Sequence, residues 1–431
     1  MPVDDSSDVA TGSVTPKSAQ ESLVTQVLSS PESVQGVRPA FQPIVDLRTD
    51  AVVGAEALAR WPQVPGVDPS AVIARARNEG RVTEVDRACR NAALRTVSSL
   101  GYLDDGMTIF VNVEPDALID RPADSGDIFD TSTDGLRVVL ELTERALLDD
   151  PAQLLNVVAD ARTRGFGIAL DDVGRNADSL TLLSLIAPDV VKLDGSLIAG
   201  PPTHEQLHVI CAVTAYAEVT GAVILAEGIE TEAHRRRAVD LGATLGQGWL
   251  LGRPAALPPT RWPPISVDNR VPINRDPLVI PPQPSRLLER LRLRRATRSV
   301  LMRYSTYLEE QALDSDEPFT VLASFQSADR FTHVSAQRYA LLAESNSLVA
   351  VIASGMPSEP APGVRGTTIS TDDPLAREWT VVILGRHYFA ALIAVELAPE
   401  ADDNSRQFAY AITHDRATVV AAARALLSHL V

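Results

Sequence analysis

Cysteine is scarce in this chain of 431 residues, with Cys89 and Cys211 as its two examples. Two cysteines that lie so far apart form neither a disulfide framework nor the close spacing of metal ligands. The sequence is therefore not of the disulfide-stabilised secreted class, and we expect the protein to work in the reducing cytoplasm.

Positive charge is also in deficit, since 39 Lys and Arg residues stand against 56 Asp and Glu, for a formal net charge of −17. This balance argues against broad, non-specific binding to nucleic acid or to an anionic membrane. It does not exclude a small anionic ligand that is held by metal ions and a few cations.

Long hydrophobic runs and a signal peptide are lacking as well. The most apolar stretch, residues 379–397, is interrupted by "GRH", which predicts two strands around a turn rather than a membrane span. The N-terminus is acidic and polar, without a basic or an apolar segment of the kind that directs secretion. We expect residues 1–35 to be a disordered tail.

What the sequence does have is a regular alternation of short apolar runs and helix-like segments between residues 38 and 254. Eight such runs predict an α/β fold, a (β/α)8 TIM-type barrel. The connection "RTDAVVG" between the first two runs is too short for a helix, so we expect a hairpin and one antiparallel strand. The barrel would span residues 36–254, followed by a Pro-rich linker (255–285) and a smaller C-terminal α/β domain (286–431).

Polar residues stand at or near the C-terminal ends of almost all of these runs. In chain order they are Glu56, Asn112, Glu141, Asp171 with Asp172, Lys192, Glu227 and Gln247, while Gln42 lies in the first run. The carboxyl ends of parallel barrel strands share one face, and that face holds the active site. We therefore expect these side chains to meet in one site.

The number of carboxylates in this set indicates metal ions. The neighbouring Asp171 and Asp172 alone would repel by about 4 kcal/mol at about 4 Å and an effective dielectric constant near 20. An oxygen-rich set with an added amide suits Mg²⁺ or Mn²⁺, and the lack of Cys argues against zinc. Two such ions that share a carboxylate are a common device for cleaving phosphate esters, and Lys192 could orient the attacking water or accept its proton.

The motif "EALARW", residues 56–61, resembles the signature of the EAL family of cyclic di-GMP phosphodiesterases. The segments "FQPIVDL", "FVNVEP", "ELTE", "LDDVG", "VKLDG", "AEGIET" and "GQGWLLGRP" follow in the order of that family across residues 40–254. The resemblance implies a modified barrel that hydrolyses cyclic di-GMP to linear pGpG with two Mg²⁺ or Mn²⁺ ions. It also implies a homodimer.

The resemblance implies a role for each matching residue. The implied metal ligands are Glu56, Asn112, Glu141, Asp171 and Asp172. The implied catalytic residues are Lys192, Glu227 and again Glu56. The implied substrate contacts are Gln42, Leu58, Arg60 and Gln247, and Glu144 would support the loop after the aspartates.

That loop departs from the family pattern. Active members usually continue "DDFGTGYSS", whereas this chain has "DDVGRNADS", which changes residues 173–178. Three interpretations follow: a phosphodiesterase, a receptor that binds cyclic di-GMP without cleaving it, and a scaffold for protein interactions. The third predicts lost metal ligands, and none is lost, so we favour the first and keep the second as the alternative.

The C-terminal residues 286–431 resemble the DICT domain, a sensory module, which implies a regulatory input with an unknown ligand. Residues 285–311 have the pattern of an amphipathic helix with many arginines. A nucleic-acid contact is one interpretation of these arginines. The acidic character of the whole chain instead favours a solvated or interdomain face, whose positive charge balances the negative charge of the barrel.

Overall fold

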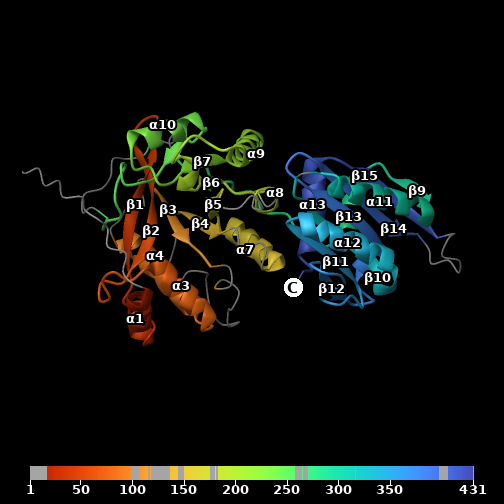
Figure 1. The fold of residues 1–431 in the computed structure, drawn as a ribbon, viewed down its shortest axis with the longest axis horizontal. Helices are drawn as coiled ribbons and strands as arrows, with labels where there is room; N and C mark the ends of the chain where they lie inside the picture. Colours follow the sequence, from red (N-terminus) through yellow and green to blue (C-terminus); the bar gives the residue numbers. More distant parts are fainter. Residues whose placement is uncertain are drawn as a thin grey trace, which may run out of the picture.

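Two β-sheets organise the protein in the computed structural model: a closed barrel in its N-terminal part and an open sheet in its C-terminal part (Figure 1). The described residues are 17–99, 106–114, 117, 136–143, 150–174, 180, 183–257, 265, 270–315, 317–397 and 406–430. Within these ranges no helix combines the length and the apolar composition that crossing a bilayer requires.

Eight strands close the barrel in chain order. They are β1 (Arg38–Asp46), β2 (Val52–Arg60), β3 (Thr108–Asn112), β4 (Arg137–Thr143), β5 (Gly167–Val173), β6 (Val190–Leu193), β7 (Val223–Ala226) and β8 (Leu245–Gly246). Strand β1 runs antiparallel to β2 and β8, and the other neighbours are parallel. The predicted barrel with one antiparallel strand is thus confirmed.

Helices surround the barrel where the sequence supplies caps and apolar faces. They are α1 (Lys17–Val27), α2 (Pro31–Gln35), α3 (Pro69–Asn78), α4 (Val82–Ser99), α7 (Pro151–Thr163), α8 (Leu183–Ile186), α9 (His204–Thr220) and α10 (Glu232–Asp240), with the 3₁₀ turn η3 (Gly195–Leu197). Helix α9 shows why these bounds arise. Thr203 and Gln206 form a capping box at its start, and Gly221 ends it with φ of 76°.

Residues 17–35 correct one expectation, because they form α1 and α2 rather than part of a disordered tail. Val27 and Val34 of these helices are fully buried in a cluster that also contains Trp61 and Val72. The sparse apolar residues of this polar segment therefore have a partner surface, which composition alone does not reveal.

The C-terminal part is an open sheet of seven strands in the order β12-β11-β10-β13-β14-β15-β9. The strands are β9 (Arg294–Thr297), β10 (Thr320–Ser327), β11 (Leu348–Ser354), β12 (Arg365–Ile369), β13 (Glu378–Leu384), β14 (Phe389–Glu396) and β15 (Gln407–Thr413). The helical segments are η5 (Pro284–Arg290), α11 (Arg298–Leu313), η6 (Ala328–Arg330), α12 (His333–Ser345), η7 (Pro374–Arg377) and α13 (Arg416–Leu427). This confirms the smaller α/β domain.

The two faces of this sheet pack against different helices. Side chains that alternate along β10 divide between two clusters, with Val321 and Ala323 in one and Leu322 in the other. Helices α11 and α12 cover the face of Val321. Helix α13 covers the opposite face, and its cluster continues into the barrel through Leu185 and Ile186 of α8.

The expected single helix over residues 285–311 is wrong. The segment divides into η5, the strand β9 and the first part of α11. Residues Arg294–Thr297 pair antiparallel with Gln407–Tyr410 of β15, more than a hundred residues later in the chain. Their amphipathic pattern fits a helix, but this distant strand edge offers them backbone hydrogen bonds, so tertiary pairing overrides the local pattern.

Candidate active site

Lys192 is the centre of a group of carboxylates at the C-terminal ends of the barrel strands. Its Nζ lies 2.7 Å from Glu141 Oε1, 2.8 Å from Glu227 Oε1 and 3.0 Å from Asp171 Oδ1. The fourth carboxylate, that of Glu56, lies 3.8 Å away. These five residues come from β2, β4, β5, β6 and the end of β7, so the barrel brings the strand-end residues together as the sequence predicts.

Glu141 and Lys192 are both fully buried, and their charges define the electrostatics of the interior. Burial raises the pKa of Glu141 well above its ordinary value, Glu56 adds to the rise, and Lys192 opposes it. Burial alone would lower the pKa of Lys192, but the carboxylates, Glu141 first, raise it well above its ordinary value. The ammonium group is therefore a fixed positive charge at neutral pH.

Glu56 is held by a chain of amide groups. Gln247 Nε2 donates to Glu56 Oε2 at 2.6 Å and lies 3.1 Å from Gln42 Oε1, while Gln42 Nε2 donates to the carbonyl of Gly252. Asn112 Nδ2 donates to the other oxygen, Glu56 Oε1, at 2.9 Å. Burial would raise the pKa of Glu56, but Lys192 and these hydrogen bonds outweigh it and lower the pKa. Glu56 is thus an ionised and oriented carboxylate.

Asp171, Asp172 and Glu227 form the more open side of the site. One oxygen from each of the three carboxylates lies within 4.8 Å of the others. Asp172 has φ of 56°, an unusual value for a residue other than glycine, and its N–H donates to Asp171 Oδ1 at 3.0 Å. The pairing of β5 with β6 shifts register between Leu170 and Val173, and this irregularity presents both aspartates at the strand end.

The donor set fits divalent cations such as Mg²⁺ or Mn²⁺, because it consists of carboxylate and amide oxygens. Glu141 Oε1 pairs with Lys192, whereas the buried Oε2 has no hydrogen-bond partner among the described residues. Burial raises the pKa of Glu227 to about 8, with Lys192 opposing the rise. Bound cations would therefore stabilise the ionised form of these clustered carboxylates.

The remaining predicted residues lie at the rim or outside the described part. Leu58 and Arg60 follow Glu56 along β2 at intervals of two residues. Their side chains therefore lie on the same side of the strand as that of Glu56. Leu58 is half-buried and Arg60 is exposed, with its Nη1 donating to the carbonyl of Ala59. Glu144 and residues 175–178 of the altered loop lie outside the described residues.

Two structural partners of the site were missed in the sequence. The carbonyl of Gly252 holds Gln42, although the two residues are 210 positions apart. Gly174, with φ of 108°, leaves no room for a Cβ, which would lie 2.6 Å from Leu197 Cδ1. Gly174 belongs to the motif "LDDVG" and Gly252 to "GQGWLLGRP", but neither motif indicates by itself which side chain the glycine contacts.

Family comparisons agree with the two-part architecture. Residues 28–254 match the EAL domain, and residues 285–397 match the DICT domain, described as a sensory domain in diguanylate cyclases and two-component systems.

The chain is 30% identical over 220 residues to "Cyclic di-GMP phosphodiesterase RocR" of Pseudomonas aeruginosa, a match that covers 50% of this chain and 56% of that protein. It is also 30% identical over 223 residues to "Probable cyclic di-GMP phosphodiesterase PdeB" of Escherichia coli, covering 51% and 42%. The chain thus spans about half of the length of these relatives, or less.

Two solved structures with similar folds carry a cyclic dinucleotide in their names. "PaMucR Phosphodiesterase, c-di-GMP complex" is 24% identical with a TM-score of 0.46, covering 54% of this chain and 97% of its own. "Klebsiella pneumoniae BlrP1 pH 9.0 manganese/cy-diGMP complex" is 27% identical with a TM-score of 0.45, covering 51% and 56%.

Proposed function

Because the chain belongs to the EAL-domain family, we propose that its barrel hydrolyses cyclic di-GMP to linear pGpG at the strand-end site, with two divalent cations. The observation that supports this most strongly is the meeting of four carboxylates around Lys192, with Asp171, Asp172 and Glu227 on the open side. Relatives that carry this activity in their names match the chain over its EAL region.

The residues that would hold the two cations are Glu56, Asn112, Glu141, Asp171 and Asp172. When bound, Mg²⁺ or Mn²⁺ polarises a phosphoryl oxygen and lowers the pKa of a water molecule. Asp171 and Asp172 would both supply oxygen ligands to the cations, which accounts for two adjacent carboxylates in a strained backbone.

The protein's own side chains would position the water and the dinucleotide. Lys192, whose Nζ contacts Glu141, Glu227 and Asp171, would orient the attacking water or accept its proton. Gln247 fixes Glu56 and thereby the geometry of its carboxylate. The exposed guanidinium of Arg60 can form paired hydrogen bonds to a phosphate, with Gln42 and Leu58 as further substrate contacts.

The C-terminal domain would regulate this reaction through helix α13. Arg424 Nε donates to the carbonyl of Leu185 at 2.8 Å, and Arg416 Nη2 donates to Ser184 Oγ at 2.8 Å. Ser184 and Leu185 belong to α8, which begins eleven residues after Asp172 in the chain and lies beside α13 in Figure 1. A displacement of α13 would therefore act on the segment that follows the two aspartates.

A receptor that binds cyclic di-GMP without cleaving it is the second candidate. The observation in its favour is the altered segment, in which Val173 and the residues 175–178, "RNAD", replace the Phe and the "TGYS" of active family members. This change could leave the dinucleotide contacts intact and misplace the ligands of one cation.

The test incubates the purified full-length chain with Mn²⁺ and cyclic di-GMP and separates the products by chromatography. The proposal predicts pGpG, and Glu56→Ala should abolish its formation. Calorimetric binding of the dinucleotide without any product would favour the receptor instead. The homodimer implied by the family remains a proposal, which light scattering of the same sample tests.

A further inference from the structure

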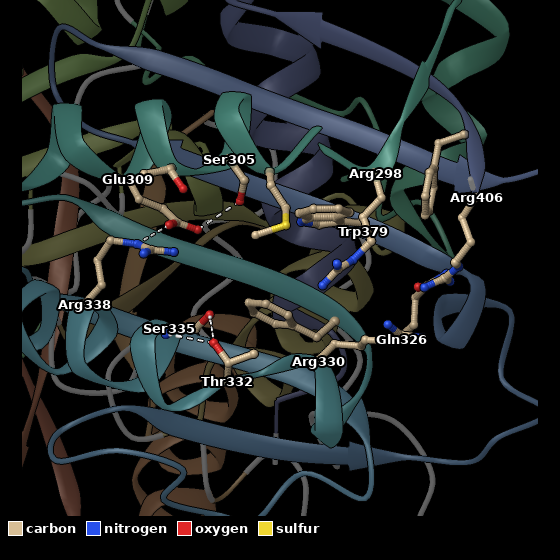
Figure 2. Close-up of a pocket in the computed structure, with 14 residues that line it drawn as sticks. Arg298, Ser305, Glu309, Gln326, Arg330, Thr332, Ser335, Arg338, Trp379 and Arg406 are labelled. Atoms are coloured by element: carbon tan, nitrogen blue, oxygen red, sulfur yellow. Dashed lines mark hydrogen bonds and ion pairs between the residues drawn. The ribbon is translucent and has the colours of Figure 1, made fainter. Parts of the chain in front are cut away.

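A pocket in the C-terminal domain lies far from the barrel site, between helices α11 and α12 and the face of the sheet that they cover (Figure 2). Its empty volume is about 600 Å³, including the space at its open mouth. The proposed phosphodiesterase reaction makes no use of this pocket.

Arginine is the most frequent residue type in the lining. Four guanidinium groups, those of Arg298, Arg330, Arg338 and Arg406, face one carboxylate, that of Glu309. Arg338 Nε donates to Glu309 Oε2 at 2.5 Å, and Arg406 pairs at 2.6 Å with Glu396, which is not one of the lining residues. This charge balance favours an anion over a cation inside the pocket.

Aromatic and thioether side chains form the apolar part of the lining. Trp379 and Phe408 meet with ring centroids 6.0 Å apart at an angle of 79°, and Phe325 and Met302 also line the pocket. The buried Nε1 of Trp379 has no hydrogen-bond partner among the described residues, so an acceptor on a ligand could satisfy it. Such walls suit a planar ring, to which Met302 can adapt.

The two ends of the pocket differ in character. Figure 2 shows Glu309, Ser305 and Arg338 at one end, and Arg298, Trp379 and Arg406 at the other. Glu309 is fixed by hydrogen bonds from Ser305 Oγ at 3.0 Å and from Tyr339 OH at 2.9 Å. The one carboxylate of the lining thus lies at the Glu309 end, and the Arg298 end, which carries guanidinium groups and no lining carboxylate, is the more favourable end for an external anion.

We propose that this pocket binds a small planar aromatic anion, with the ring against Trp379 and Phe325 and the carboxylate or phosphate against Arg298 and Arg330. Both arginines are partly exposed, so they can reach a ligand that enters through the mouth. Guanidinium groups recognise carboxylates and phosphates through paired, charge-assisted hydrogen bonds. The inference concerns binding to this domain and does not depend on the activity of the barrel.

The test is calorimetry of the full-length chain with three matched probes: naphthalene-2-carboxylate, 2-naphthyl phosphate and the neutral 2-naphthamide. We expect saturable binding of at least one anion, about tenfold or more tighter than that of the amide. The tighter of the two anions identifies the preferred acidic group. If neither anion binds more tightly than the amide, the proposal is overturned.

Variants locate the site. Arg298→Gln and Arg330→Gln should each weaken binding of the anion about tenfold, whereas Arg298→Lys should retain part of the affinity because the charge remains. Arg303→Gln, on the same helix but exposed and outside the pocket, is the matched control and should bind normally. Equal affinity of the wild-type protein and both Gln variants would place the anion elsewhere and overturn the proposal. If a Gln variant fails to fold, the affinity of the Arg298→Lys variant still tests the contribution of the Arg298 guanidinium group.

Discussion

Lys192 and Glu141 face each other across the closed interior of the barrel, with 2.7 Å between Nζ and Oε1 and with both side chains withdrawn from solvent. A buried charge pair of this kind is costly to break from one side, because the remaining charge is left without a partner. Each of these two buried charges therefore depends on the other for its stabilisation.

Replacement of one partner of this pair should destabilise the protein strongly. Lys192→Met should lower the free energy of unfolding by about 3–5 kcal/mol, measured by urea denaturation without added cations. The double variant Lys192→Met/Glu141→Gln should recover part of that loss, because the second change removes the stranded carboxylate. An unchanged urea midpoint for Lys192→Met would show that the pair does not carry the proposed charge coupling.

A second buried pair ties the segment after the barrel to the barrel wall. Asp189 accepts hydrogen bonds from Arg162 at 2.5 Å and from the backbone N–H groups of Asn274 and Ile168, each at 2.7 Å. Asp189→Ala should cost about 3–5 kcal/mol of stability. Asp160→Ala, which removes the exposed pair with Arg164, is the control and should cost about 1 kcal/mol or less. Similar losses for both variants would contradict this assignment.

Glu378 should make the stability of the protein depend on pH. This carboxyl group lies on β13 and accepts the N–H of Ser285, and burial raises its pKa from 4.5 to about 7. Between these values the folded protein holds a proton that the unfolded chain releases, so stability is present below pH 4.5 and is lost as the pH rises towards 7. The expected loss is about 3 kcal/mol.

Urea denaturation from pH 4.5 to 8 measures this loss by comparison with Glu378→Gln, which cannot titrate. The difference between the wild-type protein and this variant should follow the predicted fall, whereas the exposed Glu359→Gln should track the wild type. Parallel curves for all three proteins would rule out Glu378 as the titrating group.

The contact between α13 and α8 should couple the C-terminal domain to the reaction. Arg424→Ala removes hydrogen bonds to the carbonyls of Leu185 and Ser184, so it should change the kcat of cyclic di-GMP hydrolysis about twofold or more. Arg377→Ala, an exposed change on the same domain, should leave kcat and KM as they are. If Arg424→Ala also leaves both constants unaltered, regulation does not pass through this helix.

The sequence predicted most of the barrel and the convergence at its rim, because strand periodicity and strand ends are local patterns. Glu56, Glu141 and Lys192 lie within strands that apolar runs mark in the sequence. The partition of residues 285–311 could not be predicted in this way, since β9 depends on a strand edge that arrives more than a hundred residues later. The contacts of Gln42 with Gly252 and of Arg424 with Leu185 could not be predicted either, because the partners lie more than 200 positions apart in the chain.

Turnover of cyclic di-GMP as a function of added Mn²⁺, starting from chain stripped of metal with a chelator, tests the central proposal most directly. We predict no pGpG before the cation is added, a rate that rises with Mn²⁺ towards saturation, and a loss of about 100-fold or more in Asp172→Asn. Turnover by the stripped protein, or a saturated protein that binds the dinucleotide and never releases pGpG, would contradict it.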